Sequence, residues 1–290
     1  MLKHWLLASR PKTLVASLLP VVAGFLLAYE QSVSVSWEIP LLCLVYCSMV
    51  QIGTNFANDY FDFIKGADFK RDNAPKRMVS SGLIKPRAML VALILVFLVS
   101  FVVGIYIMEA VSGSRILILV GISSIIFGVV YTGGPYPLAY NGLGDIFVII
   151  FFGFVAVLTT HYVTVLSVGA SWKPNYFLPL GVGFVINNLL VVNNYRDYEE
   201  DMEVGKKTLV VLFGKKFGLG LFLIGVLIPN LLIPFLVPSA WTTIFLLPLG
   251  IYIFLSLPKV LISKDYSKIL SLCALNVLLY GILLLLGYLN

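Results

Sequence analysis

Long apolar segments constrain the fold of this chain more than any other feature. Nine segments of about 17 residues or more carry few charges or none. A segment of that length can cross the hydrocarbon core of a bilayer as a helix. Only 12% of the residues are charged, about half the share found in soluble domains. We therefore expect nine membrane spans, near residues 13–29, 39–57, 88–108, 115–132, 143–168, 176–194, 217–236, 240–257 and 269–289.

Backbone hydrogen bonding decides which kind of element can form these spans. Lipid offers no partners to N–H and C=O groups, so only helices and closed barrels cross a membrane. The alternation of apolar and polar residues that is typical of barrel strands is missing from the sequence. The sequence therefore predicts an all-α integral membrane protein. We expect one membrane-embedded domain over residues 1–290, with cytoplasmic cap loops near 58–87 and 193–216.

The basic residues lie almost entirely on one side of the predicted membrane. If the N-terminus is cytoplasmic, 18 of the 20 Lys and Arg residues fall in cytoplasmic segments, and only Arg115 and Lys173 fall outside. This bias is the usual determinant of membrane orientation. The net charge of +6 is thus a topology signal rather than a sign of nucleic-acid binding. We expect the lipid bilayer as surroundings, no nucleic-acid partner and no obligate protein partner.

Two acidic clusters interrupt this basic side. Asp59 and Asp62 follow the second span, and Asp197 and Asp201 follow the sixth. If the helices continue, each pair shares one helix face, because residues three or four apart are neighbours there. Since four helices separate the clusters, both lie on the same side, as in a parallel internal duplication.

Carboxylates this close together repel each other unless a cation lies between them. Oxygen ligands without nitrogen or sulfur donors suit Mg²⁺, which prefers a few carboxylates together with substrate phosphates. Basic residues between the acids can bind the outer phosphate oxygens. The alternative is that the acids are solvated caps of helix ends. Two similar clusters on one side argue against it, and the sequence predicts one magnesium–diphosphate site.

These segments resemble a known family. NDYFD followed by GADFKRD, and NNYRDYEEDMEVGKKTL, are similar to the two Asp-rich motifs of the UbiA superfamily of intramembrane prenyltransferases. The segments RPKTL, YTGGPYPLAYNGLGD and GKKTL resemble one branch of it, the 1,4-dihydroxy-2-naphthoate polyprenyltransferases of bacterial menaquinone synthesis. The first motif departs from the commonest form, NDxxDxxxD, because its third acid is delayed to Asp68.

The resemblance implies a UbiA-type fold, with nine transmembrane helices around a central cavity that opens sideways to lipid. It implies a place in the bacterial cytoplasmic membrane, with the N-terminus and the active site facing the cytoplasm. The implied reaction transfers a polyprenyl group from an allylic diphosphate to 1,4-dihydroxy-2-naphthoate. Carbon dioxide and diphosphate are lost, and demethylmenaquinol forms. The implied cofactor is Mg²⁺, with Asp59, Asp62, Asp68, Asp197 and Asp201 as ligands.

Residues near the two motifs have chemistry that suits the same reaction. Basic side chains and amides can bind diphosphate oxygens. Tyr131, with Tyr136 and Tyr140 near it, can stabilise an allylic cation by cation–π contact. Arg10 or Lys12 can hold the acceptor carboxylate. The expected substrate-binding residues are Arg10, Lys12, Asn55, Asn58, Arg71, Arg77, Asp145, Asn194 and Arg196, and the expected catalytic residues are Asp59, Asp62, Asp197, Asp201, Tyr131 and Lys207.

Two other functions stay open from the sequence. A sister prenyltransferase can carry the same acidic motifs and use 4-hydroxybenzoate or homogentisate as its acceptor. A multi-pass transporter is the second alternative, but transporters place polar groups near the membrane midplane. Here nearly every charge lies at one face, which favours a reaction at that face.

Overall fold

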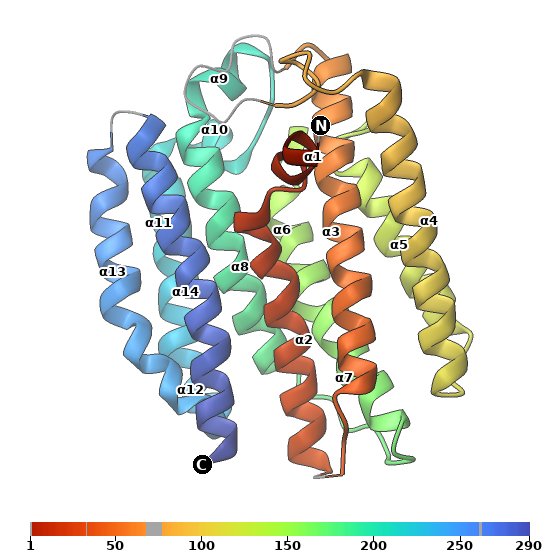
Figure 1. Ribbon diagram of the computed structural model, residues 1–290. Coiled ribbons are helices and arrows are strands. Elements are labelled where there is room, and N and C mark those ends of the chain that lie inside the picture. Colours follow the sequence, from red (N-terminus) through yellow and green to blue (C-terminus); the bar gives the residue numbers. More distant parts are fainter. Residues whose placement is uncertain (1, 33, 68–76, 261–262) are drawn as a thin grey trace.

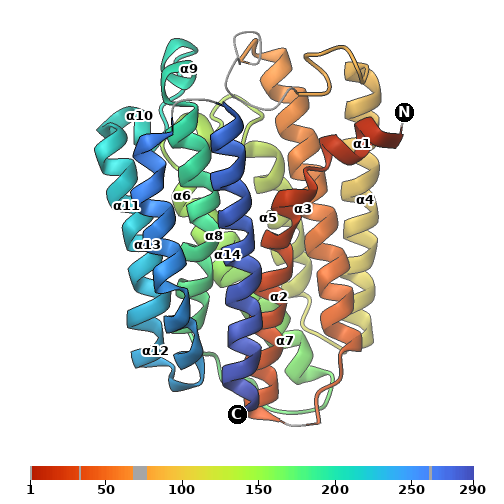
Figure 2. The same cartoon turned by 60° about the vertical axis from the view of Figure 1, so that its left-hand side comes forward.

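The long helices pack side by side in one bundle. The computed structural model describes residues 2–32, 34–67, 77–260 and 263–290, and every regular element among these residues is a helix. Figures 1 and 2 show the two ends of the chain at opposite ends of the bundle. The expected all-α membrane architecture is confirmed.

Eight helical segments of the described residues are long and apolar enough to cross a membrane. Five of them are continuous helices, α2, α3, α4, α8 and α14, although α2 contains an internal proline, Pro20. Three are built from shorter pieces. The bounds are Pro11–Gln31 (α2), Glu38–Ile64 (α3), Pro86–Ala110 (α4), Gly144–Leu166 (α6, η2 and α7), Phe177–Arg196 (α8), Lys215–Leu236 (α11, η3 and α12), Pro238–Lys259 (η4, α13 and η5) and Asp265–Leu289 (within α14, Ser263–Leu289).

The predicted span 115–132 differs from the other eight. The helix found there is α5, Ile116–Val130, with only 15 residues. At about 1.5 Å per residue it is about 22 Å long, which is shorter than the hydrocarbon core of about 30 Å. Its end has a local cause. The turn that follows contains Gly133 and Gly134, the latter at φ 75°, and Pro135 comes directly after. The expectation of nine full-length spans was therefore wrong at this position.

Three spans contain non-α turns. The span Gly144–Leu166 consists of α6 (Gly144–Val148), the π-helix η2 (Ile149–Val155) and α7 (Ala156–Leu166). Such π-turns occur frequently at functional sites. The later pieces are α11 (Lys215–Leu227), the π-helix η3 (Ile228–Leu232), α12 (Ile233–Leu236), the 3₁₀-helix η4 (Pro238–Leu246), α13 (Leu247–Ser256) and the 3₁₀-helix η5 (Leu257–Lys259).

Short elements gather at the end of the bundle where α3 stops at Ile64 and α8 stops at Arg196; we call it the cap end (Figures 1 and 2). The predicted cap loop at 193–216 contains two of them, α9 and α10. The other predicted cap loop, 58–87, is described only in part. The short elements are α1 (Leu2–Ala8), the 3₁₀-turn η1 (Leu138–Tyr140), α9 (Tyr198–Glu203) and α10 (Leu209–Phe213).

The spans differ in how deeply they are buried. The most apolar windows of α2 and α8 are 67% and 72% buried, whereas that of α4 is 22% buried. Thus α2 and α8 are inner helices, while α4 lies at the edge and presents residues such as Leu95 and Leu98 outward. Close packing of α2 depends on Gly24. A Cβ atom there would lie 2.6 Å from the carbonyl oxygen of Val157 and 2.7 Å from Cβ of Thr160, both on α7.

Replacing Gly24 with alanine should therefore separate α2 from α7. We expect Gly24→Ala to lower the thermal unfolding midpoint in detergent, since overpacking of this kind costs about 1–3 kcal/mol. Gly220→Ala is the matched control, because a Cβ atom at Gly220 has no heavy atom within 4 Å. Equal midpoints for the two variants would contradict the close approach of α2 and α7.

Candidate active site at the cap end

A cavity of about 280 Å³ lies among the first five spans and the short helix α5. Its walls come from α2, α3, α4, α5, the α6–η2–α7 span and α8. The part near the cap end is polar, and the walls farther along the spans are mainly apolar. The polar lining residues near the cap end are Arg10, Asn55, Asn58, Tyr131 and Asn193.

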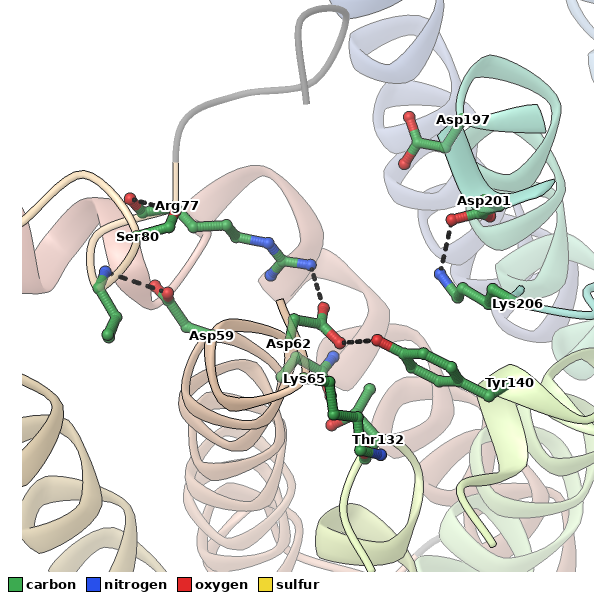
Figure 3. A network of polar contacts seen from close by, with 12 residues as sticks. Asp59, Asp62, Lys65, Arg77, Ser80, Thr132, Tyr140, Asp197, Asp201 and Lys206 are labelled. Carbon is green, nitrogen blue, oxygen red and sulfur yellow. Dashed lines mark hydrogen bonds and ion pairs between the residues drawn. The ribbon is translucent and has the colours of Figure 1, made fainter. Parts of the chain in front are cut away.

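Asp62 lies near the end of α3 and is 5% exposed. Its Oδ2 atom accepts a hydrogen bond from Nη2 of Arg77 at 3.0 Å. Its Oδ1 atom accepts a hydrogen bond from the hydroxyl of Tyr140 at 2.8 Å (Figure 3). Lys65 lies one turn further, and its Nζ atom is 4.7 Å from the ring centroid of Tyr140. Burial lowers the pKa of the Lys65 ammonium, and the nearby Asp62 carboxylate opposes that shift.

Asp59 has a different set of partners from Asp62. Its two carboxylate oxygens accept backbone N–H groups, from Met78 at 3.0 Å and from Val79 at 3.2 Å. Figure 3 shows Asp59 turned toward this segment and away from Asp197 and Asp201. Asp59 thus holds the segment that contains Arg77 against α3.

The second acidic cluster lies where α8 gives way to α9. Asp197 separates the two helices, and its carbonyl oxygen accepts the backbone N–H of Asp201 at 2.7 Å. Arg196 binds both carboxylate oxygens of Asp197, with Nε at 2.5 Å and Nη2 at 2.9 Å. Asp201 accepts a hydrogen bond from Nζ of Lys206 at 3.1 Å. Figure 3 shows this cluster across from Asp62, with Tyr140 and Lys206 between them.

The expected amide residues are buried near the cavity. Asn55 donates to the carbonyl oxygen of Ser9 at 2.9 Å, and Asn58 accepts from the hydroxyl of Thr132 at 2.8 Å. Asn193 lines the cavity, whereas the expected Asn194 is buried beside it. The sequence could have indicated Asn193, because it precedes Asp197 by one helical turn and therefore lies on the same helix face.

Arg10 and Lys12 occupy different surroundings. Arg10 separates α1 from α2, has a left-handed backbone (φ 53°, ψ 68°) and lines the cavity. Lys12 is exposed, and its Nζ atom donates to the hydroxyls of Ser267 at 3.3 Å and Ser271 at 3.1 Å on α14. The structure therefore brings only Arg10 of the two to the cavity.

The remaining expected residues are placed as follows. Asp145 is 4% exposed at the start of α6, and its Oδ1 atom accepts a hydrogen bond from Asn187 of α8 at 3.1 Å. The Lys207 side chain is exposed, while its backbone N–H donates to the carbonyl of Tyr140 at 3.0 Å. Tyr136 is 60% exposed. Asp68 and Arg71 lie outside the described residues.

The described carboxylates are not gathered as a metal-binding group. Within the part of the chain that the structure describes, no group of three or more His, Cys, Asp or Glu side chains is arranged to hold a metal ion. Each of Asp62, Asp197 and Asp201 is paired with a basic side chain instead. Sequence reasoning did not find the contact between Tyr140 and Asp62, or the backbone partners of Asp59.

Comparison with known proteins agrees with this architecture. Residues 17–286 match the UbiA prenyltransferase family. The chain is 39% identical over 211 residues to 1,4-dihydroxy-2-naphthoate octaprenyltransferase from Mycobacterium leprae. The aligned region covers 73% of this chain and 69% of that protein. The chain is also 29% identical over 293 residues to UbiA prenyltransferase domain-containing protein 1 from Xenopus tropicalis. This alignment covers 98% of this chain and 81% of that protein.

The fold is similar to that of a UbiA homologue from Archaeoglobus fulgidus bound to DMAPP and Mg²⁺. The TM-score is 0.61 at 17% sequence identity, over 96% of this chain and 99% of that one. The fold likeness, the family match over most of the chain and the identity to the mycobacterial protein all agree. The chain belongs to the UbiA prenyltransferase family.

Proposed function

We propose that this protein is a magnesium-dependent aromatic polyprenyltransferase. It transfers a polyprenyl group from an allylic diphosphate to 1,4-dihydroxy-2-naphthoate, with loss of carbon dioxide and diphosphate, and forms demethylmenaquinol. The observation that carries the proposal is a pair of buried acid–base clusters that lie one helical turn beyond Asn58 and Asn193, which line the polar part of the cavity. The mycobacterial relative, named for this naphthoate substrate, supports the choice of acceptor.

The donor set at the cap end suits a magnesium–diphosphate complex. Asp62, Asp197 and Asp201 are each about 5% exposed or less, and they offer oxygen ligands of the kind that Mg²⁺ prefers. When bound there, Mg²⁺ would act as a Lewis acid on the diphosphate leaving group. Asp68, a further expected ligand, and Asp59 complete the proposed set. The solved archaeal homologue, bound to DMAPP and Mg²⁺, supports this assignment.

The basic partners of these carboxylates are the proposed diphosphate clamps. Arg77, Arg196 and Lys206 can exchange a carboxylate partner for a phosphate oxygen and so keep the charge of the site balanced. Asp59 holds the segment of Arg77 against α3 through two backbone hydrogen bonds. Asn58, Asn194 and the basic residues Arg71 and Lys207 are further proposed contacts to the diphosphate.

The apolar part of the cavity suits the prenyl chain and the allylic cation. Phe127 contributes to an aromatic wall, with ring centroids 4.9 Å from Phe147 and 5.1 Å from Phe151. A wall of this kind excludes water, which would otherwise capture the cation. Tyr131 lies where the wall meets the polar end, and its ring is positioned to stabilise positive charge.

Two further residues are proposed to bind the acceptor. The guanidinium group of Arg10 suits a planar carboxylate at the polar end of the cavity. Asp145, oriented by Asn187, is placed to position a ring hydroxyl. The cap end would face the cytoplasm of a bacterial cell, since the basic residues gather there. The prenyl chain would stay within the bilayer.

A different aromatic acceptor is the second candidate. The Xenopus tropicalis relative matches nearly the whole chain, and its name specifies no acceptor. A sister prenyltransferase that uses 4-hydroxybenzoate or homogentisate would keep the acidic clusters and the apolar cavity unchanged. Only the residues near Arg10 and Asp145 would have to differ in role.

A product assay distinguishes the two candidates. The purified protein should convert 1,4-dihydroxy-2-naphthoate and a prenyl diphosphate, in the presence of Mg²⁺, to a product that has lost the mass of carbon dioxide. Mass spectrometry with prenyl diphosphates of mixed length also gives the preferred chain. Turnover of 4-hydroxybenzoate without turnover of the naphthoate would contradict the proposal that the acceptor is 1,4-dihydroxy-2-naphthoate.

Removing one charge from either acidic cluster should stop the reaction. We expect Asp62→Asn and Asp197→Asn each to lower kcat by about 100-fold or more, as the loss of an electrostatic group aimed at the reacting centre does. Asp265→Asn is the control, since Asp265 is paired with Lys268 at 3.0 Å on α14 and touches neither cluster. Near-normal turnover in either cluster variant would refute a shared site.

Substitutions of Arg10 and Lys12, the two residues expected to bind the acceptor carboxylate, should have different effects on KM. Arg10→Asn removes the guanidinium group but suits the left-handed backbone, which Asn adopts more readily than most residues. We expect it to raise KM for the aromatic acid about tenfold or more, the effect of one charge-assisted pair. Lys12→Met, which breaks only the contact with α14, should leave that KM unchanged. A rise in KM for the prenyl diphosphate alone would place Arg10 at the diphosphate instead.

A further inference from the structure

Tyr140 contacts Asp62 of the first acidic cluster and Lys206, the lysine that pairs with Asp201 of the second. Its hydroxyl donates to Oδ1 of Asp62 at 2.8 Å, in the first cluster. Its ring centroid lies 4.7 Å from Nζ of Lys65 and 5.5 Å from Nζ of Lys206, the partner of Asp201 in the second cluster. Figure 3 shows the hydroxyl of Tyr140 pointing toward Asp62, with Lys206 and Asp201 above the ring. Asp62, Lys65 and Lys206, which come from two distant parts of the sequence, thus all contact the side chain of Tyr140.

The backbone of this turn is fixed without help from the Tyr140 hydroxyl. Leu138 and Ala139 are buried, and the backbone N–H of Ala139 donates to the carbonyl of Tyr131 at 2.9 Å. The carbonyl of Tyr140 itself accepts the backbone N–H of Lys207 at 3.0 Å. These main-chain bonds hold η1 between α5 and the segment after α9, so the side chain can be altered without removing its support.

We propose that Tyr140 is a positioning residue that joins the two acidic clusters into one diphosphate site. The hydroxyl orients the carboxylate of Asp62, and the ring holds the ammonium groups of Lys65 and Lys206 in the space between the clusters. This inference rests on the proposed function, because it takes the space between the clusters as the place of the diphosphate.

The chemistry of a phenol suits this position better than that of a charged residue. A neutral O–H donor orients Asp62 without adding a second positive charge beside it, since Arg77 already binds the other oxygen. The ring face attracts ammonium groups without pairing with them. Lys65 donates to the carbonyl of Thr132 and Lys206 donates to Asp201. An ammonium group has three donors, so in the proposed site the other donors of each lysine can bind phosphate oxygens.

The hydroxyl and the ring have different partners, so their removal should have different effects. Tyr140→Phe removes the bond to Asp62 and keeps the ring, whereas Tyr140→Leu also removes the ring. The probe is inorganic pyrophosphate, titrated calorimetrically into the full-length purified protein at several Mg²⁺ concentrations.

For Tyr140→Phe, the Mg²⁺ concentration for half-maximal pyrophosphate binding should rise about threefold to tenfold, the effect of one hydrogen bond. Affinity at saturating Mg²⁺ should stay close to that of the unaltered protein. For Tyr140→Leu, affinity at saturating Mg²⁺ should fall by about threefold or more as well, because two cation–π contacts are lost.

Asn141→Ala is the matched control for damage to the turn. It removes the side-chain bond to the carbonyl of Pro137 at 2.7 Å, in the same turn. We expect it to lower the unfolding midpoint without changing the Mg²⁺ dependence. If Tyr140→Leu fails to fold, Tyr140→Phe alone decides.

Two results would overturn the role of Tyr140 while the proposed function stands. One is a Tyr140→Phe variant with the Mg²⁺ dependence of the unaltered protein, and the other is an Asn141→Ala variant that reproduces the shift. If the unaltered protein binds no pyrophosphate with Mg²⁺, the proposed function itself is contradicted, and the role of Tyr140 with it.

Discussion

The pairing of buried carboxylates with basic side chains is the interaction on which the cap end depends. An unpaired charge in such a place would cost several kcal/mol. Asp62, Asp197 and Asp201 avoid that cost through Arg77, Arg196 and Lys206. The Asp62–Arg77 pair joins residues 15 positions apart and so helps to hold the segment before α4 against the end of α3. Tyr140 extends the connection from α3 to the segment after α9.

The same charges divide the molecule into two chemical environments. The cap end supplies oxygen ligands and cations, whereas the cavity walls below it are mainly apolar and aromatic. A prenyl diphosphate has the same division, with a highly charged head and a hydrocarbon chain. The proposed reaction occurs where the two environments meet, near Tyr131 and Arg10, so that the diphosphate is neutralised while the cation is kept from water.

Sequence reasoning found what depends on local composition. Spans such as α3 and α8 follow from apolar length alone, which needs no knowledge of tertiary contacts. A helix was expected at 115–132, but α5 is shorter than a full span, because it begins after Arg115 and ends at the turn that contains Gly133 and Gly134. The bond between Tyr140 and Asp62 joins residues 78 positions apart, and no local pattern reveals it. Nor does sequence separate Arg10 from Lys12, since the break between α1 and α2 decides which one lines the cavity. The roles of all the expected site residues stay predictions, and Asp68 and Arg71 lie outside the described residues.

The central claim is that the two acidic clusters hold one diphosphate between them. A structure of the protein with a non-hydrolysable prenyl diphosphate analogue and Mn²⁺, located by its anomalous scattering, tests it most directly. The account predicts one diphosphate with metal between Asp62 on one side and Asp197 and Asp201 on the other. Its prenyl chain should lie in the cavity lined by Phe127 and Phe151. A diphosphate bound to one cluster alone, with the other cluster still in its present acid–base pairs, would contradict it.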